Sequence, residues 1–497
     1  MLSCYIREQY GYTADELFAV FKHCNSTGKK ISKEYIIRLW HELVKYGLTR
    51  IVRKKALGKD LSELSTEDVI MSHNISDDSD YRYVCAFVGI IVIDGIVLKC
   101  YPKYIASTNS PLEEMCQVIK VLNKYYNRSQ TVFFNSALDS ENEQYNLLSV
   151  MLSLMYDYYQ YGLYTKEQVI NERNGRGEIL WDKTVDNEIA VISNGRPFYP
   201  DIISKKRLND EESFVRKVHA WVISDCSKRL EKADLLKIFA LEPVDVEQQD
   251  ICELGDSEYI IYRLKQEQSV QFNTRKIHLL ELLETYLNKE CQWNKEMGFS
   301  LYGSTSFNLI WQNVCSEVFG DVINTRLMDL PLGIKEPYTK LSYKTMKEIM
   351  PHPLWTVTDN NGEYHNTFGK GTLESDIIVL NSKEDFWQLV VYDAKYYLLD
   401  MNSDGFLSGN PGVGDVTKQY LYALFYKKFA VQNGIKELYN AFLFPAEKLA
   451  CGAEKVGKVT FSIFDDLKLD PVVLYKIDAV NLFDSYLYGR KMVLDDF

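Results

Sequence analysis

Apolar residues recur at helical spacing in the first part of the chain. A segment that starts at Thr13 opens with a capping pattern and then places its apolar residues on one side. A second stripe of apolar residues predicts another helix over residues 32–46. The pattern therefore predicts a helical module over residues 1–75, and it leaves open whether this module is winged-helix-like or a plain helical cap.

A change in this pattern marks the first predicted boundary. Residues 76–80 are polar and charged, and β-branched residues become frequent after them. Two such runs flank Asp94-Gly95, a dipeptide that favours a β-hairpin turn, so we expect a β-containing domain over residues 81–255. Helical and strand patterns then mix over residues 270–497. The 497-residue chain is accordingly predicted to be a multidomain protein of the α+β and α/β classes.

Composition limits the classes of function. A formal net charge of −12 argues against a protein that coats DNA through a basic surface. It does not exclude a nuclease, because a carboxylate-rich metal site is locally acidic and a partner can supply the contacts to phosphate. The ten cysteines and seven histidines lack the spacing of zinc ligands. Without a signal-peptide pattern or a run of about 18 apolar residues, we expect a cytoplasmic protein that does not enter a membrane.

Three charged residues flank two apolar runs with strand character, residues 377–380 and 387–392. Asp376 stands before the first run, and Asp393 and Lys395 follow the second. Side chains two residues apart on a strand point to the same face. In a hairpin, the start of one strand also lies beside the end of the next. We therefore expect these three side chains to converge at one edge of the hairpin.

Charges that converge in this way are costly to bury unless something pairs them. Mg²⁺ prefers carboxylate and carbonyl oxygens, and Mn²⁺ can replace it in such sites. The expected ligands are Asp376, Asp393 and the backbone carbonyl of Ala394. The metal would stabilise charge on a phosphodiester and lower the pKa of the attacking water. Lys395 would orient or activate that water and add positive charge.

This arrangement resembles the motif of the PD-(D/E)xK nucleases. Asp376 and the sequence Asp393-Ala394-Lys395 match the charged positions of the motif, and Ser375 stands where proline is usual. The resemblance implies a nuclease domain with a mixed central sheet flanked by helices, built in the order α-β-β-α-β.

The residues around the motif fit the same order. Residues 306–319 would form the leading helix, and residues 440–444 would form the strand that closes the core. Between them, Asp415 is expected to be the N-cap of a polar helix. The resemblance implies that Gln419 in this helix holds the lysine or contacts phosphate, and an exposed helix glutamine fits the sequence equally well.

Further segments resemble one family more closely, the LlaJI restriction endonucleases. The segments that carry this resemblance are Gly89-Ile90-Ile91, Tyr101-Pro102-Lys103-Tyr104, the stretch from Asn174 to Thr184, and Arg196-Pro197-Phe198-Tyr199. In the second of them we expect Lys103 to be exposed. The family is related to McrC, the nuclease subunit of prokaryotic McrBC-type restriction systems.

The resemblance implies a division of labour with partners. Residues 81–255 would be a McrC-like docking domain for a McrB-like AAA+ GTPase or ATPase, and residues 270–497 would cut duplex DNA. A DNA methyltransferase can belong to the same system. The segment Thr27–Lys30 lacks the first glycine and the closing Ser or Thr of a P-loop, so we expect this chain to bind no nucleotide.

The leading helix departs from the usual motif. Where these nucleases often carry a glutamate that faces the metal, Gln312 follows Trp311, and the nearest acid is Glu317. Two alternatives to the nuclease subunit therefore stay open. The chain could be a non-catalytic adaptor that stimulates an NTPase, or it could be a stand-alone repair nuclease.

Overall fold

The computed structural model describes residues 2–23, 32–56, 68–69, 80–93, 96–128, 147–210, 213–246, 251–293, 299–384, 386–401, 405, 407–467 and 469–494. Contacts divide the chain into two compact units, each made of segments that are distant in sequence. The middle unit consists of Met1, Val92–Gly95 and Glu141–Ser300, and the terminal unit consists of Leu2–Ile91, Ile96–Ser140 and Leu301–Phe497. The boundaries predicted from the sequence, near residues 75–81 and 255–270, do not coincide with this division.

Three features expected from the sequence fall outside the described residues. They are the polar break at residues 76–79, the turn at Asp94-Gly95 and the segment Thr27–Lys30. Within the described part of the chain, no helix is both long enough and apolar enough to cross a lipid bilayer.

The first part of the terminal unit contains the two predicted helices, strands at the two β-branched runs that flank Asp94-Gly95, as predicted, and further strands within residues 2–53 that were not predicted. Thr13 and Glu16 form a capping box at the start of the first helix, with bonds of 2.8 and 3.1 Å to each other's backbone N–H. The elements of this region are β1 (Leu2–Arg7), β2 (Gly11–Tyr12), α1 (Ala14–His23), α2 (Lys33–Lys45), β3 (Thr49–Arg53), β4 (Tyr81–Cys85), β5 (Val88–Ile93), β6 (Ile96–Tyr101) and α3 (Leu112–Arg128). Of the two alternatives for residues 1–75, the plain helical cap is therefore wrong, because β1, β2 and β3 accompany the helices.

Two sheets organise these elements. One has the strand order β1-β6-β5-β12, where β12 is Phe299–Ser304, and the other has the order β2-β4-β3. β1 and β6 run parallel, and β5 and β6 are buried along their whole length. Gly89 and Gly303 let β5 and β12 approach closely, because a Cβ on Gly89 would lie 2.1 Å from the carbonyl oxygen of Tyr302.

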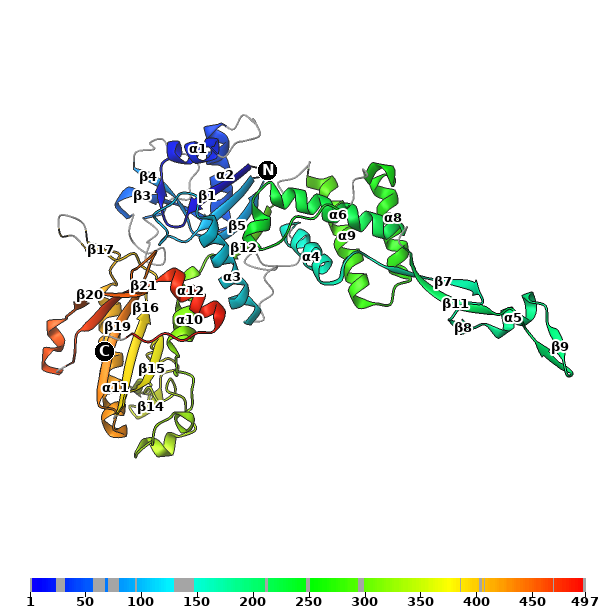
Figure 1. The fold of residues 1–497 in the computed structure, drawn as a ribbon. Coiled ribbons are helices and arrows are strands. Elements are labelled where there is room, and N and C mark those ends of the chain that lie inside the picture. The colour runs from blue at the N-terminus through cyan, green and yellow to red at the C-terminus, as the bar shows by residue number, and fades with distance from the viewer. Residues whose placement is uncertain are drawn as a thin grey trace. The chain divides into compact units, whose positions relative to one another are not determined.

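The second part of the terminal unit is a five-stranded mixed sheet with the order β15-β16-β19-β21-β20. β15 and β16 are antiparallel, β16, β19 and β21 are parallel, and β20 is antiparallel to β21. The elements are α10 (Phe307–Phe319), β15 (Ile377–Ser382), β16 (Trp387–Ala394), α11 (Val413–Asn433), β19 (Glu437–Ala446), β20 (Ala453–Val459), β21 (Val472–Asp478) and α12 (Ala479–Tyr488). The succession α10-β15-β16-α11-β19 has the predicted α-β-β-α-β order (Figure 1).

The two faces of this sheet are covered by different helices. Leu389 and Val391 of β16 pack in one hydrophobic cluster with Tyr426 and Phe429 of α11. Tyr392 points to the other face, where its ring lies 5.4 Å from that of Phe319 in α10. Because side chains alternate along a strand, Asp393 shares the α11 face with Leu389 and Val391.

Smaller elements complete the terminal unit. They are the hairpin β13 (Leu354–Thr358) and β14 (Tyr364–Phe368), the pair β17 (Asp400–Met401) and β18 (Leu407–Ser408), and the 3₁₀ helices η1 (Lys54–Ala56), η3 (Leu327–Asp329), η4 (Tyr338–Leu341) and η5 (Ser462–Leu467).

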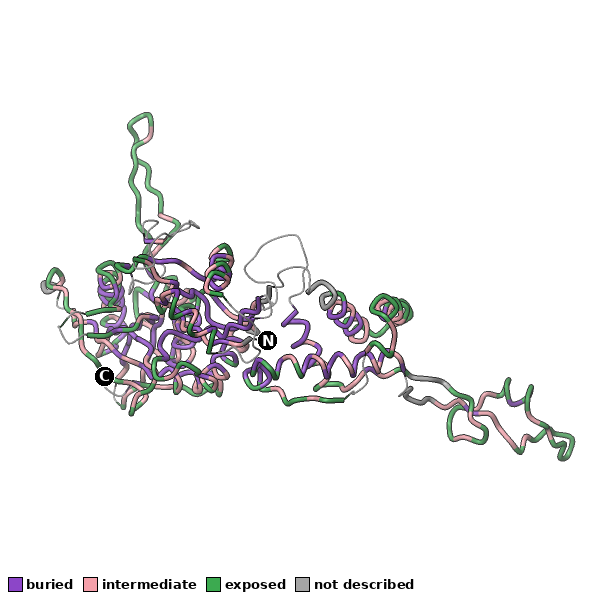
Figure 2. Tube along the Cα trace, turned by 90° about the horizontal axis from the view of Figure 1, so that it is seen from above, coloured by how far each residue is buried: buried purple, intermediate pink, exposed green. Residues whose placement is uncertain are grey.

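The middle unit is a group of helices from which a β-arm extends. The helices are α4 (Leu147–Tyr161), α6 (Phe214–Glu231), α7 (Leu235–Ile238), η2 (Ile251–Glu253), α8 (Ser257–Ser269) and α9 (Thr274–Trp293). The β-arm consists of β7 (Lys166–Arg173), β8 (Glu178–Ile179), α5 (Trp181–Asn187), β9 (Val191–Ser193), β10 (Arg196–Phe198) and β11 (Ile203–Asp210). β11 pairs with both β7 and β8. Figure 2 shows that exposed and intermediate residues dominate the β-arm, which lies on the right of both views.

Candidate active site

Asp376 and Asp393 lie opposite each other where β15 begins and β16 ends. The antiparallel register pairs Ile377 with Tyr392, so one further step along both chains places Asp376 across from Asp393. The backbone N–H of Ala394 donates to Oδ2 of Asp376 at 3.3 Å. The hairpin therefore brings the two predicted acids together, as the spacing of the apolar runs indicated.

Lys395 completes the group from the residue after β16. Its backbone N–H donates to the carbonyl of Leu443 in β19, which continues the pairing of the two strands. Its ammonium lies 3.2 Å from Oδ2 of Asp393 and 3.1 Å from Oδ1 of Asp415. The side chain is thus fixed between two carboxylates at the sheet edge.

The expected capping role of Asp415 is wrong. The N-cap of α11 is Gly412, and Asp415 lies in the first turn of the helix. Its carboxylate is turned to Lys395 instead of to the backbone of the turn. An acid near a helix N-terminus is stabilised by the helix dipole, so α11 holds this negative charge next to the lysine.

The electrostatics of the group show an excess of negative charge. Burial raises the pKa of Asp393 well above its usual range, the Asp376 carboxylate raises it further, and Lys395 offsets only part of this. Burial lowers the pKa of Lys395, but the charges of Asp393 and Asp415 outweigh burial and hold that pKa above its ordinary value. Three carboxylates therefore share one ammonium.

One carboxylate oxygen of the group lacks a hydrogen bond within the described residues. Oδ1 of Asp393 is buried and has no hydrogen-bond partner among the described residues. An unpaired buried carboxylate oxygen is costly, and a divalent cation coordinated by Asp393 and Asp376 would remove that cost. The donor set of two carboxylates and a neighbouring carbonyl, that of Ala394, is the oxygen set that Mg²⁺ or Mn²⁺ takes. The residues present fit the predicted metal.

Gln419 lies inside the fold, so the expectation of an exposed helix glutamine was wrong. Its Nε2 donates to Oδ1 of Asn440 at 2.6 Å and to the carbonyl of Val391 at 3.2 Å. Nδ2 of Asn440 returns a bond to the carbonyl of Gln419 at 3.0 Å. These bonds tie α11 to β16 and β19. Within the described residues, the bonds of Gln419 do not include one to Lys395.

Two residues near the acids were missed by the sequence reasoning. Tyr422, two helical turns after Asp415, has a pKa raised to about 12, first by burial and then by the charges of Asp393 and Asp376. Asp321 follows the end of α10 and accepts bonds from the backbone N–H groups of Ile378 and Ile323, both at 2.9 Å. Helical spacing from Asp415 could have indicated Tyr422. No local pattern indicated Asp321, because it accepts a bond from Ile378, which lies 57 residues later in the chain.

Asp321 follows Gly320, the C-cap residue of the leading helix α10. Burial raises the pKa of Asp321, and the charge of Asp376 adds to that effect. Gln312 and Glu317 lie on α10, which packs on the sheet face opposite Asp393. Both oxygens of Asp321 are already engaged, because Oδ1 accepts the two backbone N–H groups and Oδ2 accepts the hydroxyl of Ser316 at 2.9 Å.

A buried network joins the first sheet of the terminal unit to the residue after Lys395. The hydroxyl of Tyr396 donates to Oε2 of Glu8 at 2.7 Å, and the backbone N–H of Lys103 donates to the same oxygen at 3.2 Å. The ammonium of Lys103 donates to Oε1 of Gln9 at 2.7 Å and lies 4.5 Å from the ring centre of Tyr396. Lys103 is therefore buried, and the expectation that it is exposed was wrong.

Comparison with known proteins gives the family context of this site. The family model of the LlaJI restriction endonuclease matches residues 87–483. The Type II restriction enzyme BsuMI component YdjA of Bacillus subtilis strain 168 is 29% identical over 473 residues, which cover 92% of this chain and 91% of that protein.

Two solved assemblies were also found as structural relatives. One is a half-complex from the tetradecameric assembly of Thermococcus gammatolerans McrB AAA+ hexamers with bound McrC, with a TM-score of 0.37, 13% identity, and coverage of 98% of this chain and 99% of that chain. The other is the McrBC complex of the same organism, with a TM-score of 0.22, 11% identity, and coverage of 58% and 87%.

The family match begins near β5 in the first sheet of the terminal unit, includes the middle unit, and ends within α12. It includes Asp376, Asp393 and Lys395, so the charged edge described above lies inside the matched region. The chain belongs to the LlaJI restriction endonuclease family.

Proposed function

We propose that this protein is a Mg²⁺-dependent endonuclease subunit of a restriction system, of the PD-(D/E)xK type, that hydrolyses phosphodiester bonds of duplex DNA. The observation that carries the proposal is the convergence of Asp376, Asp393 and Lys395 at one sheet edge. An acidic pair that only held the fold together would be expected to have both carboxylates hydrogen-bonded. Here one buried oxygen of Asp393 has no hydrogen-bond partner among the residues that the structure describes.

Each residue has a distinct task in the proposed reaction. Asp376 and Asp393 hold the cation, with the carbonyl of Ala394 beside them. When bound, Mg²⁺ supplies positive charge that stabilises the phosphodiester as its negative charge develops and makes a bound water more acidic. Lys395 is fixed between Asp393 and Asp415, so its ammonium is ready to donate to the attacking water or to a phosphate oxygen.

The second part of the proposal concerns a partner that delivers DNA. The chain's net charge of −12 gives it little grip on phosphate by itself. The β-arm exposes large apolar side chains on several of its elements, namely Trp181, Val185, Ile189, Val191, Ile192 and Phe198. A surface of this kind fits a protein partner. We infer that the partner is a McrB-like AAA+ NTPase, and that a DNA methyltransferase belongs to the same system.

Gly177 helps to shape the base of the β-arm. A Cβ on this residue would lie 1.9 Å from the carbonyl of Lys205 in β11, so any side chain would separate the strands. Asn174 adopts a positive φ of 54° and accepts the backbone N–H of Ile202 at 2.9 Å. The Asn174–Gly177 turn therefore holds β7, β8 and β11 in register. In this proposal the turn supports docking by keeping the β-arm in shape.

The test of catalysis uses the full chain together with a McrB-like AAA+ NTPase, and it measures cleavage of plasmid DNA with and without Mg²⁺. Asp393→Ala and Lys395→Ala are expected to abolish cleavage while the partner still binds. A matched control is Asp470→Ala, because Asp470 lies at the far end of β21 from the site. Normal cutting by the first two variants would contradict the proposal.

Two other results would favour the alternatives. Stimulation of the partner's NTPase without Mg²⁺-dependent nicking would identify a non-catalytic adaptor. Vigorous cutting by the isolated chain would identify a nuclease that acts alone.

A further inference from the structure

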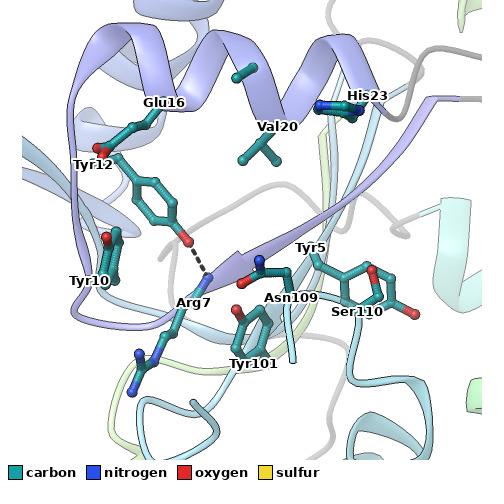
Figure 3. A pocket seen from close by; sticks show the side chains of 11 residues that line it. Tyr5, Arg7, Tyr10, Tyr12, Glu16, Val20, His23, Tyr101, Asn109 and Ser110 are labelled. Atoms are coloured by element: carbon teal, nitrogen blue, oxygen red, sulfur yellow. Dashed lines mark hydrogen bonds between the residues drawn. The ribbon is translucent and has the colours of Figure 1, made fainter. Parts of the chain in front are cut away.

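A cavity of about 570 Å³ lies in the terminal unit, between α1, β1 and the residues that follow β6. Tyrosine rings form much of its wall, from Tyr5 on β1, Tyr10 in the turn after β1, Tyr12 on β2 and Tyr101 at the end of β6. Figure 3 shows the hydroxyls of Tyr12 and Tyr101 and the amide of Asn109 turned into one space below α1. Its volume is in the range of small-molecule sites in proteins.

Two of these tyrosines are largely buried, and their hydroxyls border the cavity and still have hydrogen-bonding capacity. Tyr101 is only 3% exposed, and within the described residues its hydroxyl makes no hydrogen bond, although it borders the cavity. The hydroxyl of Tyr12, a residue 7% exposed, accepts the backbone N–H of Arg7 at 2.8 Å, so its own proton remains available. Buried polar groups are normally satisfied, and hydroxyls that open into a cavity therefore point to a polar ligand.

The charges at the cavity indicate a neutral ligand. Arg7 lines the cavity, and its Nε donates to the carbonyl of Lys103 at 2.9 Å. Its Nη2 donates to the same oxygen, so the guanidinium is already engaged. Glu16 adds a negative charge, and one of its oxygens accepts the N–H of Thr13. A phosphate group would meet little free positive charge here.

From these observations we infer that this cavity, the tyrosine pocket, binds a nucleobase. A base is planar and neutral, stacks on aromatic rings, and carries both acceptor and donor groups on its edge. The Tyr12 and Tyr101 hydroxyls donate to base acceptors, and Glu16 and the Asn109 carbonyl accept from exocyclic amines. Tyr10 is 44% exposed at the rim, where its ring lies 4.7 Å from that of Tyr12 and offers a stacking surface. The base comes either from a nucleotide everted from DNA or from a free nucleoside.

The first experiment measures binding of adenosine, cytidine, guanosine and thymidine to the full chain by calorimetry and saturation-transfer NMR. EDTA is present, so DNA cleavage plays no part in the result. Tyr101→Phe removes only the hydroxyl and should weaken binding about three- to tenfold. Tyr10→Ala removes a stacking surface and should weaken it at least about fivefold. The controls are Tyr343→Phe and Tyr343→Ala, because Tyr343 is exposed and lies outside the pocket.

The second experiment identifies the source of the base. A duplex that carries 2-aminopurine is titrated with the same proteins, and its fluorescence rises if the base leaves the stack. A rise that Tyr10→Ala and Tyr101→Phe both reduce, and that free nucleoside competes away, supports an everted base. Nucleoside binding without a fluorescence rise supports the free nucleoside as ligand.

Three results would overturn the inference. One is the absence of any nucleoside or 2-aminopurine signal from the wild-type chain, and the second is a signal that both pocket variants leave unchanged. The third is equal binding of N-acetyltryptophanamide, which would indicate a general apolar pocket. Tyr10 lies at the surface, so its variant keeps the test valid even if Tyr101→Phe disturbs folding. Because no metal is used, the outcome is separate from that of the nuclease proposal.

Discussion

The acidic edge of the five-stranded sheet and the β-arm of the middle unit present opposite physical problems. At the acidic edge, Asp393 is an acid that is buried, and one of its oxygens has no hydrogen-bond partner within the described part of the chain. On the β-arm, Ile189 and Ile192 are apolar but 85% and 75% exposed. A buried charge requires a counter-charge, whereas an exposed apolar surface is covered by another protein. Each region therefore carries an energetic cost in the isolated chain that the proposed metal or the proposed partner would remove.

An energetically unfavourable side chain can indicate function. Residues that only stabilise a fold are expected to pair their carboxylates when buried and to be polar when exposed. The chain reverses both preferences, and it does so in separate units, so the proposed metal site and the proposed partner surface can be changed independently.

The largest expected effect is on the acidic edge. Asp393→Asn keeps the shape of the side chain but removes its charge, and it should lower the rate of DNA cleavage by about a thousandfold. In the absence of divalent ions the same variant should unfold at a higher temperature than the wild type, because burial and Asp376 both disfavour the charged carboxylate. Cleavage assays and thermal unfolding measure the two effects. Loss of activity together with lower stability would show that Asp393 is a structural acid.

The next effect concerns the β-arm. Ile189→Ser and Trp181→Ala remove exposed apolar surface and should weaken binding of the NTPase partner about tenfold or more, as at interface hot spots. Fluorescence anisotropy or surface plasmon resonance measures the binding. Val431→Ser on α11 is the control, because Val431 is 71% exposed but lies in the other unit. If the control weakens binding equally, the contrast between the two regions fails.

A third prediction uses pH to sharpen the contrast. The folded-state pKa of Asp393 is raised, so the folded chain binds a proton more tightly than the unfolded chain. Without divalent ions, the free energy of unfolding should therefore fall as pH rises above about 4, by up to about 1.4 kcal/mol per pH unit. Denaturant titrations of wild type and Asp393→Asn at several pH values measure the difference. Mg²⁺ should remove the difference, and a pH-independent gap between the two proteins would contradict this account.

The smallest effect is expected in the network behind Lys395. Tyr396→Phe removes the hydroxyl that donates to Glu8 and leaves that buried carboxylate with fewer partners, which should cost about 1–3 kcal/mol of unfolding free energy. Cleavage should fall only a few-fold, because Lys395 keeps its bonds to Asp393 and Asp415. Denaturant unfolding and initial cleavage rates measure both. Tyr488→Phe, at an exposed position, serves as the control.

Local patterns predicted those parts of the fold that depend on neighbouring residues. The helices near residues 14–23 and 33–45, the β15–β16 hairpin and its three charged residues all follow from periodicity and from the residues at element ends. Sequence reasoning failed where a strand was short or joined a distant partner, as in β1, which pairs with β6 about 90 residues later. No window of neighbouring residues contains that pairing.

The sequence by itself determined that Asp376, Asp393 and Lys395 share one edge, because a hairpin register is a local property. Only the tertiary structure decided what surrounds them. It turned Asp415 from a helix cap into a partner of the lysine, buried Gln419 between helix and sheet, and joined Tyr396 to Glu8 across 388 residues of chain. It also gathered Tyr101 and Tyr12 around a cavity. The reason is physical: spacing fixes which face a side chain takes, but the partner that it meets there depends on how remote elements pack.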